Sequence, residues 1–207
     1  MQILSYAAMT VIVLWSLYGY LGSRVEQVDY SVIKKEKHYE IRNYPAHIVA
    51  QTTVSGPYQE SMSKGFRIIA GYIFGGNIKK ESVAMTAPVV TQEKVSEKIA
   101  MTAPVLMSEQ GDERVMSFGM PKVYTLDTLP VPTDPRVKLV EVPSKKFAVI
   151  RFSGYRTDAR IQAMEAKLLE LLSHDGIEIV GAPAYAGYNA PGTPPWMTRN
   201  EVLIEIK

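Results

Sequence analysis

The chain has 207 residues, a formal net charge of +2 and 46% hydrophobic residues. That length and composition allow one domain with a substantial core, and the small net charge does not predict binding to nucleic acid or another polyanion. The sequence contains no cysteine, which excludes disulfides, thiolate metal sites and a cysteine nucleophile.

The first 23 residues carry no charged side chain. A helix over residues 3–21 would be about 28 Å long, close to the ~30 Å hydrocarbon core of a membrane. Trp15, Tyr18 and Tyr20 lie towards its C-terminal end, as residues of an interfacial aromatic belt do. A signal peptide is the alternative, but no basic residue precedes the apolar run. We expect residues 1–23 to be an uncleaved single-pass membrane anchor, with the side of the membrane that the remaining chain faces left open.

Two strands are predicted at 38–42 and 47–54, separated by a turn that contains Pro45. Apolar and polar residues alternate in the second run, which is strand periodicity. A helix is predicted over about 57–74, because Ser-Gly-Pro is a typical helix start. Its apolar residues recur every three or four positions and share one face: Met62, Phe66, Ile69 and Ile73.

The hexapeptide Ala-Met-Thr-Ala-Pro-Val occurs twice, at 84–89 and at 100–105. Each copy is a short apolar run with a proline near its end, which predicts a strand. The two methionines, Met85 and Met101, are interpreted as core residues, with a thioether ligand or a loop that grips a ligand as the alternative. A further strand is predicted at 114–120, followed by a proline-rich connector.

The first unit then recurs at an offset of 98 positions, with strands at 136–142 and 146–152 and a helix over about 157–173. Pro45 matches Pro143, and a Ser-Gly pair precedes each helix. We therefore predict internal repeats over about 36–125 and 136–207. The closing strands are predicted at 177–180, 184–188 and 201–206.

Several blocks of the sequence resemble the SOUL family of haem-binding proteins. They are YEIRNYPAHIVAQTTVSG at 39–56, GYIFGGN at 71–77, KIAMTAPV at 98–105, FGMPKVYTLDTLPVPTDPRVKL at 118–139 and RNEVLIEI at 199–206. The resemblance covers roughly residues 30–207 and implies an α+β domain. Its expected form is a distorted antiparallel barrel of about eight strands with two helices in a pseudo-twofold arrangement. This architecture also resembles the effector-binding domains of certain transcription regulators, which use the groove between the halves for small apolar cations.

The sequence does not indicate an enzyme or a metal site. No Ser-His-Asp arrangement is visible, and the three histidines lack the short spacings of zinc ligands. His47 is a candidate axial ligand for haem iron only because it lies on the strand before the first helix.

The resemblance implies non-covalent haem binding between the first helix and the loop at 188–198. The apolar stripe of the helix and its flanking cations suit a flat apolar molecule with carboxylates. The candidate binding residues are Met62, Lys64, Phe66, Arg67, Ile69, Tyr188 and Trp196. The predicted function is to buffer or carry haem or a related tetrapyrrole. The alternatives are a binding module for other amphipathic small molecules, without haem, and a purely structural module.

Overall fold

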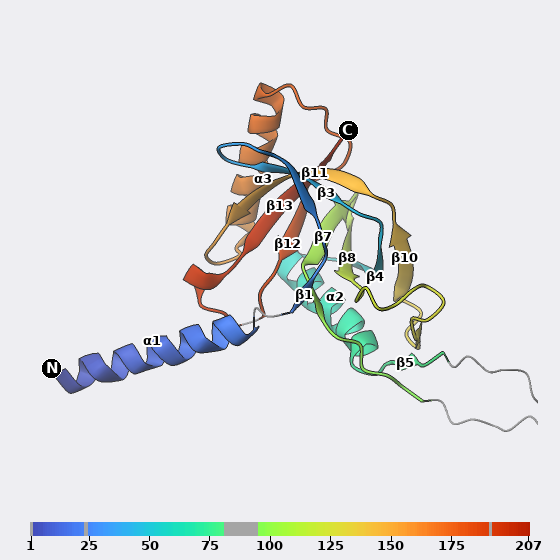
Figure 1. The fold of residues 1–207 in the computed structure, drawn as a ribbon, viewed down its shortest axis with the longest axis horizontal. Helices are drawn as coiled ribbons and strands as arrows, with labels where there is room; N and C mark the ends of the chain where they lie inside the picture. Colours follow the sequence, from blue (N-terminus) through green and yellow to red (C-terminus); the bar gives the residue numbers. More distant parts are fainter. Residues whose placement is uncertain (1, 23–24, 81–94, 191) are drawn as a thin grey trace, which may run out of the picture.

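Nine strands form one antiparallel sheet that curls into a half-barrel, with two helices against one face (Figure 1). The computed structural model describes residues 2–22, 25–80, 95–190 and 192–207. The strand order is β10-β4-β8-β7-β12-β13-β11-β3-β2, and two short two-stranded pairings, β1 with β6 and β5 with β9, lie outside the large sheet. The helices are α1 Gln2–Gly22, α2 Tyr58–Ile73, α3 Asp158–His174 and the short 3-10 helix η1 Pro195–Met197. The strands are β1 Glu26–Gln27, β2 Ser31–Lys35, β3 Glu40–Tyr44, β4 His47–Ser55, β5 Asn77–Ile78, β6 Thr102–Ala103, β7 Val105–Gln110, β8 Glu113–Gly119, β9 Val131–Pro132, β10 Lys138–Val142, β11 Lys145–Phe152, β12 Ala184–Gly187 and β13 Asn200–Ile206.

The two halves of the chain exchange their first strands. β3 and β4 are separated by Pro45 and Ala46, and β10 and β11 by Pro143 and Ser144. β4 pairs with β10, and β3 pairs with β11, so each half supplies one strand to the other. His47 lies opposite Val142, and Lys145 lies opposite Tyr44. Lys145 comes 98 positions after His47, and Val142 comes 98 positions after Tyr44, so the pairing has the pseudo-twofold symmetry expected from the sequence.

The core lies between the sheet and the helices. Alternate side chains of each strand face the helices, as the period of two in a strand requires. α2 contacts β4 and β8, whereas α3 contacts β11 and β13. Two buried clusters result, one under each helix. The fully buried members include Ile69, Tyr72, Met116 and Phe118 under α2, and Leu168, Leu172, Val202 and Ile204 under α3.

The two helices that pack on the sheet, α2 and α3, each begin a few residues after a glycine with positive φ. Gly56 has φ of 112° and Gly154 has φ of 106°, a region that favours glycine because a Cβ atom would be strained there. Thr157 then caps α3, since its side chain accepts a hydrogen bond from the Arg160 backbone N–H. The Ser-Gly pairs seen in the sequence are therefore the turns from strand to helix.

The opposite face of the sheet, which we call the open face, has no helix over it among the described residues. A buried ion cluster lies on this side. Glu201 has no exposed surface, and its carboxylate accepts hydrogen bonds from Arg42 Nη1 at 2.9 Å, Arg199 Nε at 2.9 Å and the Tyr188 hydroxyl at 2.8 Å. Burial lowers the pKa of Arg42, but the hydrogen bond and charge of Glu201, together with Tyr44, outweigh it, so the net direction is upward. This cluster joins β3 of the first half to β13 of the second.

The predicted membrane anchor is wrong. Within the described residues, no helix has both the length and the apolar character needed to cross a membrane. Hydroxyl-bearing residues and glycines interrupt the apolar run and make the helix less apolar. The last turns of α1 instead contact η1, where Trp15 Nε1 donates a hydrogen bond to the Gly192 carbonyl at 2.7 Å. The membrane contact expected through residues 3–21 and the expected membrane localisation depended on this anchor, and both are wrong for the same reason.

Other strand predictions also change. The sheet has nine strands and ends at β10 and β2, so it is a half-barrel and not a closed barrel. The first Ala-Met-Thr-Ala-Pro-Val copy lies outside the described residues. In the second copy Pro104 separates β6 from β7, so the strand pairing resumes directly after the proline. At 177–180 the structure has only an isolated bridge between Ile179 and Ile206.

Candidate functional site

A groove of about 770 Å³ runs along α2, between this helix and the segments that carry β6 and β12. We call it the helix groove. Its size lies within the range of small-molecule sites, ~300–1,000 Å³. The residues that line it are Val25, Met62, Ser63, Phe66, Arg67, Phe74, Met101, Thr102, Ala103, Val105, Arg156, Tyr185, Gly187, Tyr188, Asn189 and Ala190.

The close approach of α2 to the sheet positions the apolar wall of this groove. A Cβ atom at Gly65 would lie 3.1–3.4 Å from atoms of Met116, so the glycine lets the helix lie against β8. Phe66 follows it and packs against Phe118, with ring centroids 5.6 Å apart. Met62, one turn earlier, lines the same groove. Both side chains are partly buried, so apolar surface remains available to a ligand.

Two tyrosines from the second half form the facing wall. The Tyr185 hydroxyl donates to Asn200 Oδ1 at 2.6 Å, and the Tyr188 hydroxyl donates to Glu201 Oε2 at 2.8 Å. Burial raises the pKa of both phenols, and in Tyr188 the nearby charge of Glu201 adds to the effect. Both phenols are therefore neutral near pH 7. Because their hydroxyls already have partners, the rings contribute mainly apolar surface.

Two guanidinium groups lie at the groove. Arg67 comes from α2, and Arg156 comes from the turn before α3. Arg67 Nε donates to the Ser63 carbonyl at 3.3 Å. Within the described ranges, neither arginine has a carboxylate oxygen within 4.0 Å of its side-chain nitrogens. Both are thus free to pair with the carboxylates of a ligand.

The structure brings together Met62, Phe66, Arg67 and Tyr188 of the predicted binding residues. Lys64 faces a different, polar depression beside Arg136. Ile69 is fully buried in the core, and Trp196 packs edge-on against Trp15 with ring centroids 5.2 Å apart. The binding roles of all seven residues stay predictions.

His47 does not line the helix groove, and neither do His38 and His174. It belongs to the open face, where its Nδ1 lies 2.8 Å from the Pro45 carbonyl. A carbonyl oxygen can only accept, so Nδ1 carries the proton. The sheet separates His47 from the groove in which it was expected to ligate iron.

Sequence reasoning left several lining residues unassigned. Met101 and Val105 belong to the second copy of the hexapeptide, so the repeated hexapeptide was the sequence signal for this part of the groove lining. Tyr185 and Gly187 lie on the same face of β12, but no predicted binding residue marked that face. No sequence pattern indicates Arg156, whose place depends on how the turn before α3 folds.

Comparisons with known proteins point to one family. The family description "SOUL heme-binding protein" matches residues 25–97 and 92–205, nearly all of the chain after α1. The protein "Heme-binding protein 1" of Xenopus laevis is 29% identical over 165 residues, which cover 79% of this chain and 81% of that protein. The protein of the same name in Xenopus tropicalis is also 29% identical over 165 residues, with the same coverage.

Solved structures share the fold at low sequence identity. The C-terminal domain of EcmrR matches with a TM-score of 0.57 at 9% identity, covering 86% of this chain and 98% of that domain. A hydrolase of Listeria innocua matches with a TM-score of 0.51 at 12% identity, covering 84% of this chain and 94% of that protein. Likeness at this level extends to the architecture of the chain and not to its chemistry.

Proposed function

This chain belongs to the SOUL heme-binding protein family, and from that premise we propose that it binds haem or a related tetrapyrrole non-covalently in the helix groove. The observation that carries the proposal is the composition of this groove. An apolar wall with Met62 and Phe66 lies beside two arginines, Arg67 and Arg156, that pair with no carboxylate in the part of the chain that the structure describes. A tetrapyrrole has the matching chemistry, since it is a broad apolar plate with carboxylates at one edge. The role that follows is a buffer or carrier without catalysis.

Apolar contact supplies most of the affinity in this proposal. Covering about 300 Å² of a porphyrin at ~25 cal/mol per Å² contributes about 7 kcal/mol before the cost of association. Partly exposed ion pairs with the two arginines are worth ~0–1 kcal/mol each, so their main effect is to orient the plate.

The iron of a bound haem is not expected to depend on histidine. None of the three histidines lines the helix groove. The thioethers of Met62 and Met101 do line it, and a thioether is a soft donor. We propose weak or absent ligation by the protein, with the plate held by its faces and edge.

Titration of the purified full chain with haem and with iron-free protoporphyrin tests the function. Both are expected to bind with dissociation constants of micromolar order, corresponding to about 8 kcal/mol. Binding of neither ligand would contradict the proposal and favour an amphipathic ligand other than a tetrapyrrole.

A variant in which His38, His47 and His174 are all replaced by alanine tests the ligation. Its haem affinity is expected to stay within about threefold of the original, or about 0.7 kcal/mol, with an almost unchanged absorption spectrum. A much larger loss at unchanged stability would show that a histidine holds the iron.

A further inference from the structure

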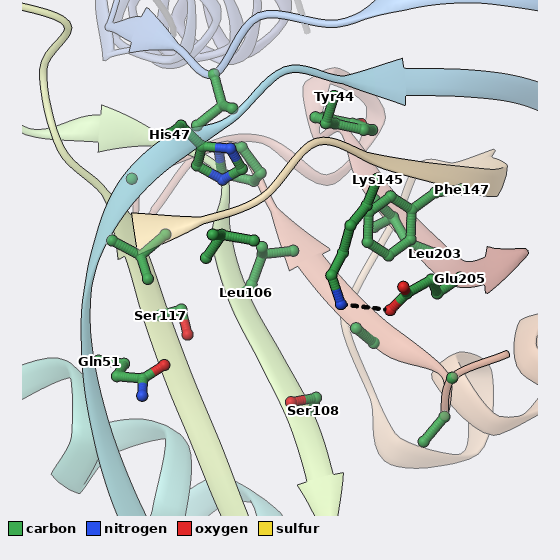
Figure 2. Close-up of a pocket in the computed structure, with 18 of the residues that line it drawn as sticks. Tyr44, His47, Gln51, Leu106, Ser108, Ser117, Lys145, Phe147, Leu203 and Glu205 are labelled. Carbon is green, nitrogen blue, oxygen red and sulfur yellow. Dashed lines mark hydrogen bonds and ion pairs between the residues drawn. The ribbon is translucent and has the colours of Figure 1, made fainter. Parts of the chain in front are cut away.

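A second groove lies on the open face of the sheet, away from the helices, and has a volume of about 460 Å³ (Figure 2). We call it the sheet groove. Its apolar surface comes from both halves of the chain and includes Leu106, Phe147 and Leu203. These strands direct alternate side chains to the two faces, so the sheet groove shares no lining residue with the helix groove.

Three neutral polar side chains line the sheet groove without partners. Gln51 projects from β4, Ser117 from β8 and Ser108 from β7, and Figure 2 shows them on these three neighbouring strands. Among the described residues, none of these three side chains makes a hydrogen bond. They are half-buried, and so they retain donors and acceptors for a molecule that fills the groove.

The charged groups of the sheet groove are already paired. Lys145 Nζ lies 2.7 Å from Glu205 Oε2, and Glu109 lies 2.8 Å from Arg114. His47 Nδ1 donates to the Pro45 backbone carbonyl at 2.8 Å. An ionised ligand would have to displace one partner of an existing ion pair in order to bind, whereas an uncharged ligand would not. The charge pattern therefore selects against ions.

We propose that the sheet groove binds a small uncharged molecule with an apolar ring body and at least one neutral hydrogen-bonding group. The ring body lies against Leu106, Phe147 and Leu203, and the polar group meets Gln51, Ser108 or Ser117. The volume suits a molecule of two or three rings, at the lower end of the ~300–1,000 Å³ range of small-molecule sites. The site is independent of tetrapyrrole binding, whose carboxylates do not suit this groove.

A matched pair of probes tests the proposal on the full chain by titration calorimetry. N-phenylnaphthylamine is uncharged and has one N–H, and anilinonaphthalenesulfonate has the same ring skeleton with an added sulfonate. The uncharged probe is expected to bind at least about tenfold more tightly than the anion. Equal or tighter binding of the sulfonate would overturn the proposal, as would the absence of binding by the uncharged probe.

Two variants locate the binding. Ser117→Phe places a ring in the sheet groove and is expected to weaken binding of the uncharged probe at least about tenfold. Phe66→Asp alters only the helix groove and is expected to leave that binding within about twofold. The reverse pattern would assign the probe to the helix groove and overturn the inference. Ser108→Phe blocks the same site from β7 and replaces Ser117→Phe if circular dichroism shows that the latter does not fold.

Discussion

The two halves of this chain share a backbone plan but differ in what their helices offer to a ligand. α3 starts 100 positions after α2, and the same three helix positions are buried in both: Ser61 and Ile161, Ile68 and Leu168, Tyr72 and Leu172. Met62 and Phe66 line the helix groove from α2. Their counterparts in α3 are Gln162 and Ala166, which are exposed.

The difference lies in a few side chains and not in the topology. At Gly65 the absence of a side chain lets α2 rest against Met116. The counterpart in α3 is Glu165, a half-buried carboxylate. One helix therefore combines a close approach to the sheet with a neighbouring apolar groove, and the other does not. A nearly symmetric scaffold can thus carry a one-sided site.

The largest effect is expected when one half of the chain is produced without the other. Residues 136–207 alone would lack β3 and β4, leaving β11 with an unpaired edge and β10 without a partner. We expect this fragment to be unfolded, and residues 25–207 to unfold in one cooperative transition. Circular dichroism during urea denaturation measures both. A folded fragment, or two separate transitions, would show that the halves are independent domains.

Removing the charge that joins the halves is expected to have the next largest effect. Glu201→Ala leaves the buried Arg42 and the half-buried Arg199 without their shared carboxylate. The expected loss is ~3–5 kcal/mol in the free energy of unfolding. Glu178→Ala is the control, because its pair with Lys207 is exposed and such pairs contribute ~0–1 kcal/mol. Similar losses in both variants would mean that the buried cluster does not hold the halves together.

The asymmetry of the helices predicts a large difference in haem binding between two equivalent substitutions. Phe66→Asp puts a carboxylate into the apolar wall of the helix groove, at an expected cost of ~2 kcal/mol or more, which is about thirtyfold in affinity. Ala166→Asp makes the same charge change on the exposed face of α3 and should alter affinity by less than about twofold. Absorbance titration with haem compares them. If both variants keep full affinity while folded, the α2 face is not the site.

The smallest expected effect is on the stability of the chain, and it comes from Glu165, the residue of α3 that corresponds to Gly65 of α2. Burial, and to a lesser degree the charge of Glu109, raise the pKa of Glu165. The folded chain therefore holds this proton more tightly than the unfolded chain, so it loses stability as pH rises from about 4.3, the usual carboxyl value, through the raised pKa. Glu165→Gln should remove this loss and stabilise by about 0.5 kcal/mol or less at pH 7.

Thermal unfolding from pH 4 to 7 measures the effect, with Glu170→Gln as the exposed control on the same helix. If Glu165→Gln is no more stable than the original chain at pH 7, the surroundings of Glu165 do not destabilise its ionised form.

The sequence predicted the paired strands and both helices because their signals are local. The Ser-Gly pairs before α2 and α3, and the alternation in β4 and β11, depend on neighbours within a few positions. The exchange of strands was not predicted, because the residues around Pro45 form a local turn signal and do not specify which distant strand will pair with β4. The N-terminal prediction failed for a related reason. It judged residues 3–21 by their own composition, and could not include the contact between Trp15 and the loop before β13.

Helical periodicity picked out side chains that line the helix groove together with side chains that lie in the core. Met62, Phe66, Ile69 and Ile73 share a stripe in the sequence, but the sheet lies nearer to the last two and leaves the first two at the groove. A stripe about 100° wide does not show which of its edges will be covered. Arg156 and Tyr185 reach the groove through long-range folding, for which a single sequence holds no local signal.

The strand exchange also sets an order of events while the chain is being made. β3 and β4 leave the ribosome first, but the strands that complete them come about 98 residues later. At ~5–20 residues per second this delay is about 5–20 s. During that time β4 lacks β10 along one edge, and β3 lacks β11, so each keeps an unpaired edge until the second half has been made.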